Sequence, residues 1–216
     1  MKKNKTNVSQ ARTAYGMIAP SMLIIVGLGF FPVLFTLWFS LNDVNPGSLA
    51  TDFIGLKNYT EILTTDAFWN SLKITLYFSL MSVVVQIVLG TLASMLLNQN
   101  FKGRGFVRGI MLIPWAVPTI VNANLWKWIF NANAGILNKV LLKLHLINEN
   151  VVWLGNGKLA INMIILSDTW KMLPLVIIML LAGLQTVSND VKEASIIDGA
   201  NAWQRFKTVY FPALKP

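Results

Sequence analysis

Two charged residues within an apolar stretch are the first candidates for chemistry in this chain. Asp168 and Lys171 are the only charges between Leu159 and Asn189, and Trp170 lies between them. A charge at the depth of a lipid bilayer is costly, so such a residue usually faces a pathway or a partner. Their i, i+3 spacing would also let the two pair on one helix face. The pattern therefore supports two interpretations, a pathway or gate lined by these three residues and a structural ion pair.

Prolines and asparagines mark a second polar feature in an apolar stretch. Pro114 and Pro118 predict a break in a helix, and Asn122 and Asn124 follow it. Proline frees backbone carbonyls, which membrane proteins tolerate where these groups face a cavity or neighbouring helices. We count Asn122 and Asn124 as candidate pathway residues. The alternative is a packing kink in which asparagines form hydrogen bonds between helices.

The residue patterns required for nucleotide, metal or covalent chemistry are missing. Gly103, Gly105 and Gly109 form a glycine cluster, but no Lys-Ser/Thr pair follows it as a phosphate-binding loop requires. His145 is the single histidine and the chain has no cysteine, which argues against a zinc site. No serine lies in a Gly-x-Ser-x-Gly elbow. We therefore predict no catalytic residue, no metal ligand and no cofactor bound by this chain.

The composition predicts a protein that is embedded in a membrane. Of 216 residues, 55% are apolar and 12% are charged, with eight tryptophans. Soluble domains carry about 25% charged residues, so the composition disfavours a soluble enzyme or a disordered chain. The absence of cysteine excludes a disulfide-stapled module. The net charge of +9 would suggest nucleic acid as a partner of a soluble protein. In a membrane protein the placement of the charges matters more, and we expect no nucleic-acid partner.

Four apolar stretches are long enough for transmembrane helices, which need about 20 residues each. The uncharged intervals place these helices near 15–41, 71–98, 107–130 and 159–184. The first stretch is longer than the core of a signal peptide, so we expect it to be an uncleaved span. Lysine and arginine are more frequent in the segments on the same side of the membrane as the N-terminus than in those on the other side. Because cytoplasmic segments usually carry the excess of basic residues, this predicts a cytoplasmic N-terminus. The expected fold is therefore an all-α, polytopic membrane protein.

Two segments are expected on the outer side of the membrane. The first, 42–70, is polar and contains turn residues from Asn45 to Gly47. The second, 131–158, has apolar residues at helical spacing, with basic residues between them. This second pattern predicts a short amphipathic helix. The helix could lie on the membrane face or pack on the protein's own outer surface.

One sizeable polar segment, 186–212, is expected on the inner side. Ser188 or the residue after it can cap a helix, and Gly199 can end that helix in a left-handed conformation. A second helix is expected over about 201–210, stopping at Pro212. Two short helices joined at such a corner predict a docking element that faces the cytoplasm. An ordinary connecting loop is the alternative.

The same inner segment carries a recognisable motif. Its residues are Glu193, Ala194, Ser195, Asp198, Gly199, Ala200, Phe206 and Pro212. The pattern resembles the Glu-Ala-Ala loop of permease subunits from bacterial ABC importers, with Ser195 in place of the third alanine and Phe211 in place of the usual leucine. The stretches 53–59, 113–118 and 170–185 resemble other segments of the carbohydrate-importing, maltose-permease-like branch. The resemblance thus covers nearly the whole chain.

The resemblance implies a function and a set of partners. It implies an ABC type I importer permease in the bacterial inner membrane that forms part of a sugar pathway. The Glu-Ala-Ala loop would dock on separate ATPase subunits, which bind the ATP and Mg²⁺. A second homologous permease and a periplasmic or extracellular solute-binding protein would complete the system. A permease for another solute, such as glycerol phosphate or an amino acid, is the alternative, and a membrane enzyme or scaffold is a rival from another class.

The resemblance also implies a division of the chain. Residues 1–70 would form a cytoplasmic tail, the first transmembrane helix and an outer segment. Residues 71–216 would form the permease core, with the coupling loop at 186–212. Because family members continue through further spans after this loop, we expect the core to be incomplete and truncated at its C-terminus.

Overall fold

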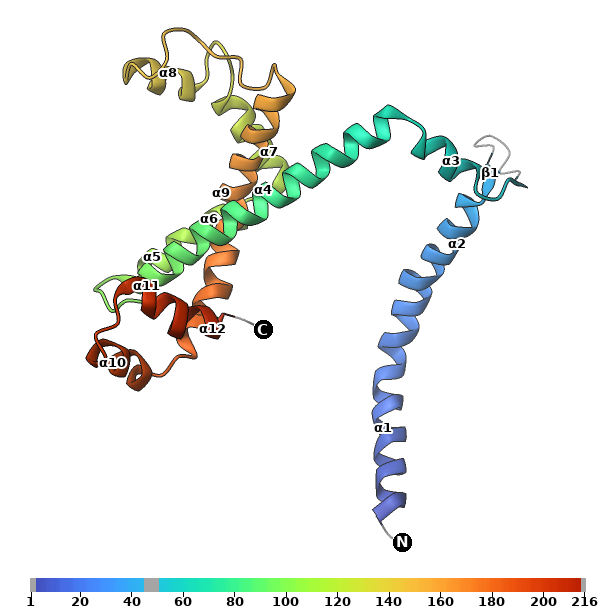
Figure 1. Cartoon of the computed structure of the whole chain (residues 1–216). Coiled ribbons are helices and arrows are strands. Elements are labelled where there is room, and N and C mark those ends of the chain that lie inside the picture. Colours follow the sequence, from blue (N-terminus) through green and yellow to red (C-terminus); the bar gives the residue numbers. More distant parts are fainter. Residues whose placement is uncertain (1–2, 45–50, 215–216) are drawn as a thin grey trace. The chain divides into compact units, whose positions relative to one another are not determined.

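The computed structural model describes residues 3–44 and 51–214 of the chain (Figure 1). The turn expected from Asn45 to Gly47 lies outside these residues. The chain divides into two compact units, Met1–Leu72 and Lys73–Pro216, which are described separately below. The described residues are mostly helical, and three helices are long and apolar enough to cross a membrane.

The first unit begins with an uninterrupted run of helix. Its parts are α1 (Lys3–Ile24), the π-helical turn η1 (Ile25–Phe30) and α2 (Phe31–Ser40). The wider turn lies just before Pro32, where the Phe31 N–H donates to the Val26 carbonyl. Because proline has no N–H to continue the ladder, a local change of helix type lets the helix pass through it. The candidate span covers Gln10–Ser40, which confirms a membrane-length first helix.

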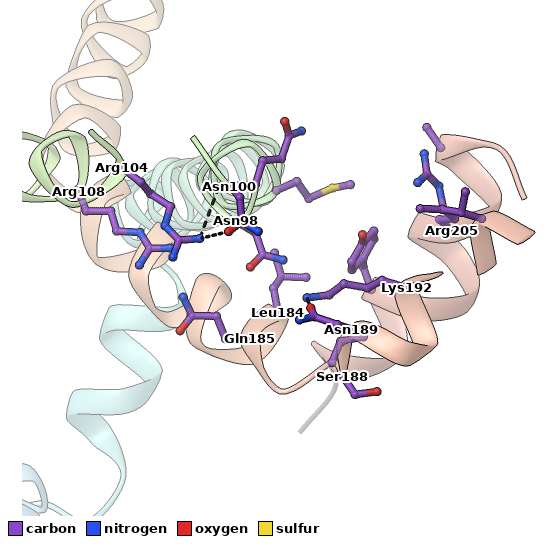
Figure 2. A pocket seen from close by; sticks show the side chains of 16 residues that line it. Asn98, Asn100, Arg104, Arg108, Leu184, Gln185, Ser188, Asn189, Lys192 and Arg205 are labelled. Atoms are coloured by element: carbon purple, nitrogen blue, oxygen red, sulfur yellow. Dashed lines mark hydrogen bonds between the residues drawn. The ribbon is translucent and has the colours of Figure 1, made fainter. Parts of the chain in front are cut away.

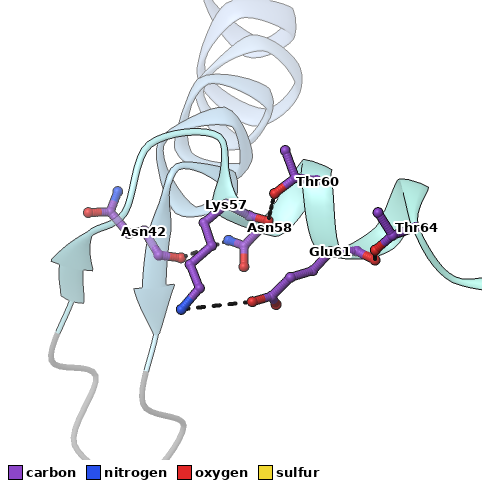
Figure 3. Close-up of polar contacts among 6 residues, drawn as sticks. All are labelled: Asn42, Lys57, Asn58, Thr60, Glu61 and Thr64. Atoms are coloured by element: carbon purple, nitrogen blue, oxygen red, sulfur yellow. Dashed lines mark hydrogen bonds and ion pairs between the residues drawn. The ribbon is translucent and has the colours of Figure 1, made fainter.

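A small β-hairpin and a short helix follow this span. Strand β1 (Asn42–Val44) pairs antiparallel with β2 (Thr51–Phe53), and α3 (Lys57–Leu63) comes next. The Asn58 side-chain amide donates to the Asn42 carbonyl at 3.1 Å (Figure 3). It also donates to the Ser40 carbonyl at 3.0 Å, and so ties α3 to the end of the span. The hairpin was not predicted, because three-residue strands leave almost no periodic signal.

The second unit holds the other membrane-length helices. Its main elements, with α4 crossing the unit boundary, are α4 (Asp66–Leu97), α5 (Arg104–Met111), α6 (Ile113–Ala116), α7 (Thr119–Ile129), α8 (Ile136–Lys143) and α9 (Gly157–Gln185). Helices α4 and α9 agree with the second and fourth predicted spans. The third predicted span is broken as expected, since Val117 is extended before Pro118. The two sides of this break differ in direction by 92°, which the sequence did not predict.

Helices α4 and α9 pack against each other through small residues. Ser82, Gly90 and Ser94 are buried on one face of α4, at multiples of four residues. A Cβ atom built on Gly90 would lie 2.8 Å from the Val176 Cγ1 atom of α9. Small residues at this spacing let membrane helices approach closely where no hydrophobic force drives them together. Leu97, Ile177 and Leu181 form the buried core beside this contact.

We predict that Gly90→Val destabilises the protein by about 1–3 kcal/mol, the usual cost of overpacking a tight contact. The branched Val176 side chain has little rotamer freedom with which to move away. Gly105→Val on α5 is the matched control, because no atom lies within 4 Å of a Cβ atom there. Unfolding in detergent measures the difference, and Val176→Ala should recover part of it. Equal stability of the two valine variants would contradict the close contact.

Candidate functional site

The two intramembrane charges do not pair with each other. The Asp168 carboxylate accepts a hydrogen bond of 2.9 Å from the Gln86 amide of α4. The Lys171 ammonium group donates to the Thr119 hydroxyl at the start of α7. No ion pair joins Asp168 and Lys171 in the part of the chain that the structure describes. The structural ion pair considered above is therefore wrong, because each charged group finds a polar partner on a neighbouring helix.

Further polar groups lie among the same three helices. The Asn122 amide of α7 donates to the Ser167 hydroxyl of α9 at 3.3 Å. Within the described residues, the Asn122 Oδ1 atom and the Thr169 hydroxyl are buried without a hydrogen-bond partner. Lys171 itself is only 7% exposed. A buried polar group normally has a hydrogen-bond partner, so these two groups are exceptions among the buried polar atoms of the bundle.

Two of the predicted pathway residues, Asn124 and Trp170, make contacts of other kinds. Asn124 is exposed and donates to the Ile120 carbonyl of its own helix at 3.0 Å, so it does not join the polar cluster. The Trp170 ring meets the Trp126 ring edge to face, with the centroids 5.9 Å apart. We name the polar groups of Gln86, Asn122, Asp168 and Lys171, with their direct partners, the helix-bundle polar cluster. Gln86 and Thr119 were missed, because nothing local in the sequence places them beside the charges.

The first helix of the inner segment, α10 (Asn189–Ile197), has clear signals at both ends. The Ser188 hydroxyl accepts a hydrogen bond of 3.4 Å from the Val191 N–H and caps the start, as predicted. At the other end Gly199 has a φ of +73°. The N–H of Ala200 donates to the Ser195 carbonyl at 3.1 Å, and the N–H of Gly199 donates to the Ile196 carbonyl at 3.0 Å. These two bonds form a Schellman cap.

The second inner helix differs from the prediction at its end. It consists of α11 (Ala202–Arg205), η2 (Phe206–Tyr210) and α12 (Phe211–Ala213). It starts with a capping box between Asn201 and Gln204, a signal that the sequence analysis missed. The helix continues past Pro212 instead of stopping there. The π-type turn before Pro212 places the proline in the first turn of α12, where no donor is required.

The motif residues fall into an exposed group and a packed group. Glu193, Ala194, Asp198 and Gly199 are exposed, and Ile197 beside them is 85% exposed. Pro212 is also exposed, whereas Ser195, Ala200 and Phe206 are partly buried. The Phe206 ring stacks on Trp203 with centroids 5.5 Å apart. Helix α10 packs against η2 on one side. Its other side is exposed and carries both acidic and apolar side chains.

The predicted outer helix is present as α8, and it depends on a residue that the sequence analysis did not select. Asn138 is 1% exposed. Its amide donates to the carbonyls of Ala132 and Val151, and its Oδ1 atom accepts from the Trp153 indole at 2.9 Å. The available signal for this buried residue was a polar asparagine among the apolar residues of an amphipathic helix. Ile136, Val140 and Leu144 are exposed, so the described part of this protein leaves much of their apolar surface uncovered.

Comparison with known proteins shows the family of the chain. Residues 86–216 match the family of binding-protein-dependent transport system inner membrane components. The chain belongs to this family. The family consists of membrane components of transport systems, so the chain is a multi-pass inner-membrane transport subunit and not an enzyme. This confirms the resemblance to ABC importer permeases.

Two named relatives cover almost the whole chain. The chain is 38% identical over 213 residues to the trehalose/maltose transport system permease protein MalF of Thermococcus litoralis, covering 99% of this chain and 72% of the relative. It is 30% identical over 214 residues to the trehalose transport system permease protein SugA of Mycobacterium tuberculosis, covering 98% of this chain and 67% of the relative.

Solved structures share the fold. A bacterial ABC transporter involved in the import of the acidic polysaccharide alginate has a TM-score of 0.81, with 20% identity over 99% of this chain and 71% of that chain. The alginate transporter in complex with an alginate pentasaccharide-bound periplasmic protein has a TM-score of 0.80, with 19% identity over 97% of this chain and 69% of that chain. The ABC importer permease fold is thereby confirmed.

Proposed function

We propose that the chain is the transmembrane permease subunit of an ATP-driven sugar importer. The observation that carries this proposal is the 38% identity, over 99% of the chain, to a protein named as a trehalose/maltose permease. The identity to a trehalose permease points to the same substrate class. A neutral disaccharide is thus the expected solute, delivered by a solute-binding protein from outside.

The helix-bundle polar cluster is the proposed part of the sugar pathway in this chain. It offers hydrogen-bonding groups from α4, α7 and α9. Within the described residues its Asn122 Oδ1 atom is buried without a hydrogen-bond partner, as is the Thr169 hydroxyl of α9. Sugar hydroxyls both donate and accept hydrogen bonds, so they suit an open acceptor such as the Asn122 carbonyl oxygen and a hydroxyl such as that of Thr169. The Trp170 and Trp126 rings offer an aromatic surface beside the cluster.

Helix α10 is the proposed contact with the ATPase. We infer that the N-terminus is cytoplasmic, which places the segment 186–212 on the cytoplasmic side after an even number of spans. The chain has no nucleotide-binding motif, so the energy of ATP must reach it through a contact with another subunit. The exposed edge formed by Glu193, Ile197 and Asp198 is suited to that contact. A second, homologous permease would complete the pathway.

The proposal is tested with the permease assembled with its ATPase and second permease in proteoliposomes. We expect a trehalose- or maltose-loaded binding protein from the same source to raise ATP hydrolysis several-fold and to drive uptake of that sugar. Binding proteins loaded with glycerol phosphate or an amino acid are the controls. Stimulation by one of these, with none by a disaccharide, would overturn the substrate class while leaving the transport role intact.

A further inference from the structure

A large basic cavity lies where the membrane helices meet the inner helices (Figure 2). Its volume is about 1000 Å³, and its walls come from the end of α4, the start of α5, the end of α9, and the α10 and α11 segments. Of the residues that the structure describes, four cations line it: Arg104, Arg108, Lys192 and Arg205. No aspartate or glutamate from the described residues lines it. The site is therefore strongly attractive to an anion.

The cations of the cavity are not neutralised by the described part of the chain. Arg104 donates to the Asn100 side chain at 3.2 Å, and Arg108 donates to the Leu97 carbonyl at 3.0 Å. These acceptors are neutral. The Nε atoms of Arg108 and Arg205 are buried without a hydrogen-bond partner among the described residues. A buried guanidinium donor without a partner is costly, so an anion that accepts from these groups would stabilise the site.

Repulsion between the cations of the cavity also favours a bound anion. Arg104 and Arg108 are one helical turn apart on α5, a spacing at which equal charges destabilise a helix. Lys192 lines the cavity from α10, and its ammonium group donates to the Asn189 side chain at 3.5 Å. Amide side chains of Asn98 and Gln185 supply further donors on the wall. Guanidinium and amide groups are donors that suit the oxygens of a phosphate group.

The position of the cavity indicates how its ligand is held. Its lining includes Leu184 and Gln185, the last residues of the membrane-length helix α9, and Met95 near the end of α4. The ends of membrane-spanning helices lie at the level of the lipid headgroups. Basic pockets between such helices on the cytoplasmic side favour acidic headgroups. We propose that this cavity binds the phosphodiester headgroup of an anionic phospholipid, attracted by the positive charges of Arg104, Arg108, Lys192 and Arg205 on its walls.

The assignment to the inner leaflet rests on the proposed orientation of the permease, whereas binding itself does not. A headgroup in this cavity would contact the α4–α5 junction and α10 at once. The bound lipid would therefore brace the base of α10, through Lys192, against the membrane helices. The acidic surface of a partner subunit and free phosphate are the other anions to be distinguished by experiment.

The test uses the purified full chain in a neutral detergent, with native mass spectrometry to count bound lipids. We expect phosphatidylglycerol to bind in preference to phosphatidylcholine. Arg104→Gln/Arg108→Gln should weaken phosphatidylglycerol binding roughly 25-fold, at about fivefold per basic residue removed. Lys102→Gln is the matched control, since Lys102 is exposed and lies outside the lining. Because Arg108 also supports the α4 end, Lys192→Gln/Arg205→Gln serves as an independent second variant with the same expected loss.

Each outcome decides the proposal. Loss of binding in both double variants, with wild-type binding in Lys102→Gln, supports it. Equal binding of the two lipids, or equal loss in the control, overturns it. Competition by inorganic phosphate or glycerol phosphate as tight as the lipid would assign the site to a free phosphate. Salt-sensitive loss of ATPase association in the double variants, with lipid binding unchanged, would assign the patch to the partner subunit. Because binding is measured without transport, its failure is distinct from failure of the proposed function.

Discussion

Gly199→Val should lower solute uptake by about tenfold or more while the protein still inserts in the membrane at wild-type levels. Gly199 closes α10 with a φ of +73°, a conformation that costs an ordinary L-residue about 1–2 kcal/mol and a β-branched residue more. No atom lies within 4 Å of a Cβ atom at this position, so the effect comes from the backbone and not from a clash. The variant would lose the Schellman cap and the corner that presents α10.

A matched substitution separates this backbone effect from a general one. Gly199→Asn should retain most of the uptake, because asparagine tolerates the left-handed conformation. Glu193→Arg should also lower uptake, since it reverses a charge on the exposed edge of α10 without altering the cap. Uptake, ATP hydrolysis and co-purification of the ATPase subunit are measured on the assembled transporter. Wild-type uptake by Gly199→Val, with normal ATPase association, would contradict a coupling role for α10.

Lys171→Ala and Asp168→Ala should each lower transport by about tenfold or more, with a smaller effect on the amount of folded protein. Both side chains contact other helices, α7 through Thr119 and α4 through Gln86. A charge retained at membrane depth is costly for stability, so its presence points to use in the pathway. Uptake by proteoliposomes is compared with helix content and yield for each variant.

An exposed lysine provides the control for this second prediction. Lys73→Ala removes a cation from α4 that is exposed to its surroundings, and it should leave uptake unchanged. Lys171→Met keeps the length of the side chain without its charge, so it tests whether the charge or the packing is needed. A fall in folded protein that matches the fall in uptake would indicate that the two charges serve only to hold the helices together.

Much of the architecture followed from local features of the sequence. The apolar stretches located the helices because a span must be long and nearly uncharged. Val117 and Pro118 break the third span for a steric reason that involves only neighbouring residues. Ser188 caps the start of α10 and Gly199 caps its end, each through hydrogen bonds between residues close together in the sequence. The first three motif residues, 193–195, lie on this locally encoded helix.

The partners of the functional side chains required the tertiary structure. The spacing of Asp168 and Lys171 allowed either an ion pair or a pathway lining, and it did not reveal their partners Gln86 and Thr119, which are distant in sequence. The 92° bend at Pro118 likewise depends on how helices pack, and so does the cavity that gathers four cations from α5, α10 and α11. Chain-local patterns fix where helices begin, end and break. Contacts between helices arise from long-range packing, which no single stretch of sequence encodes.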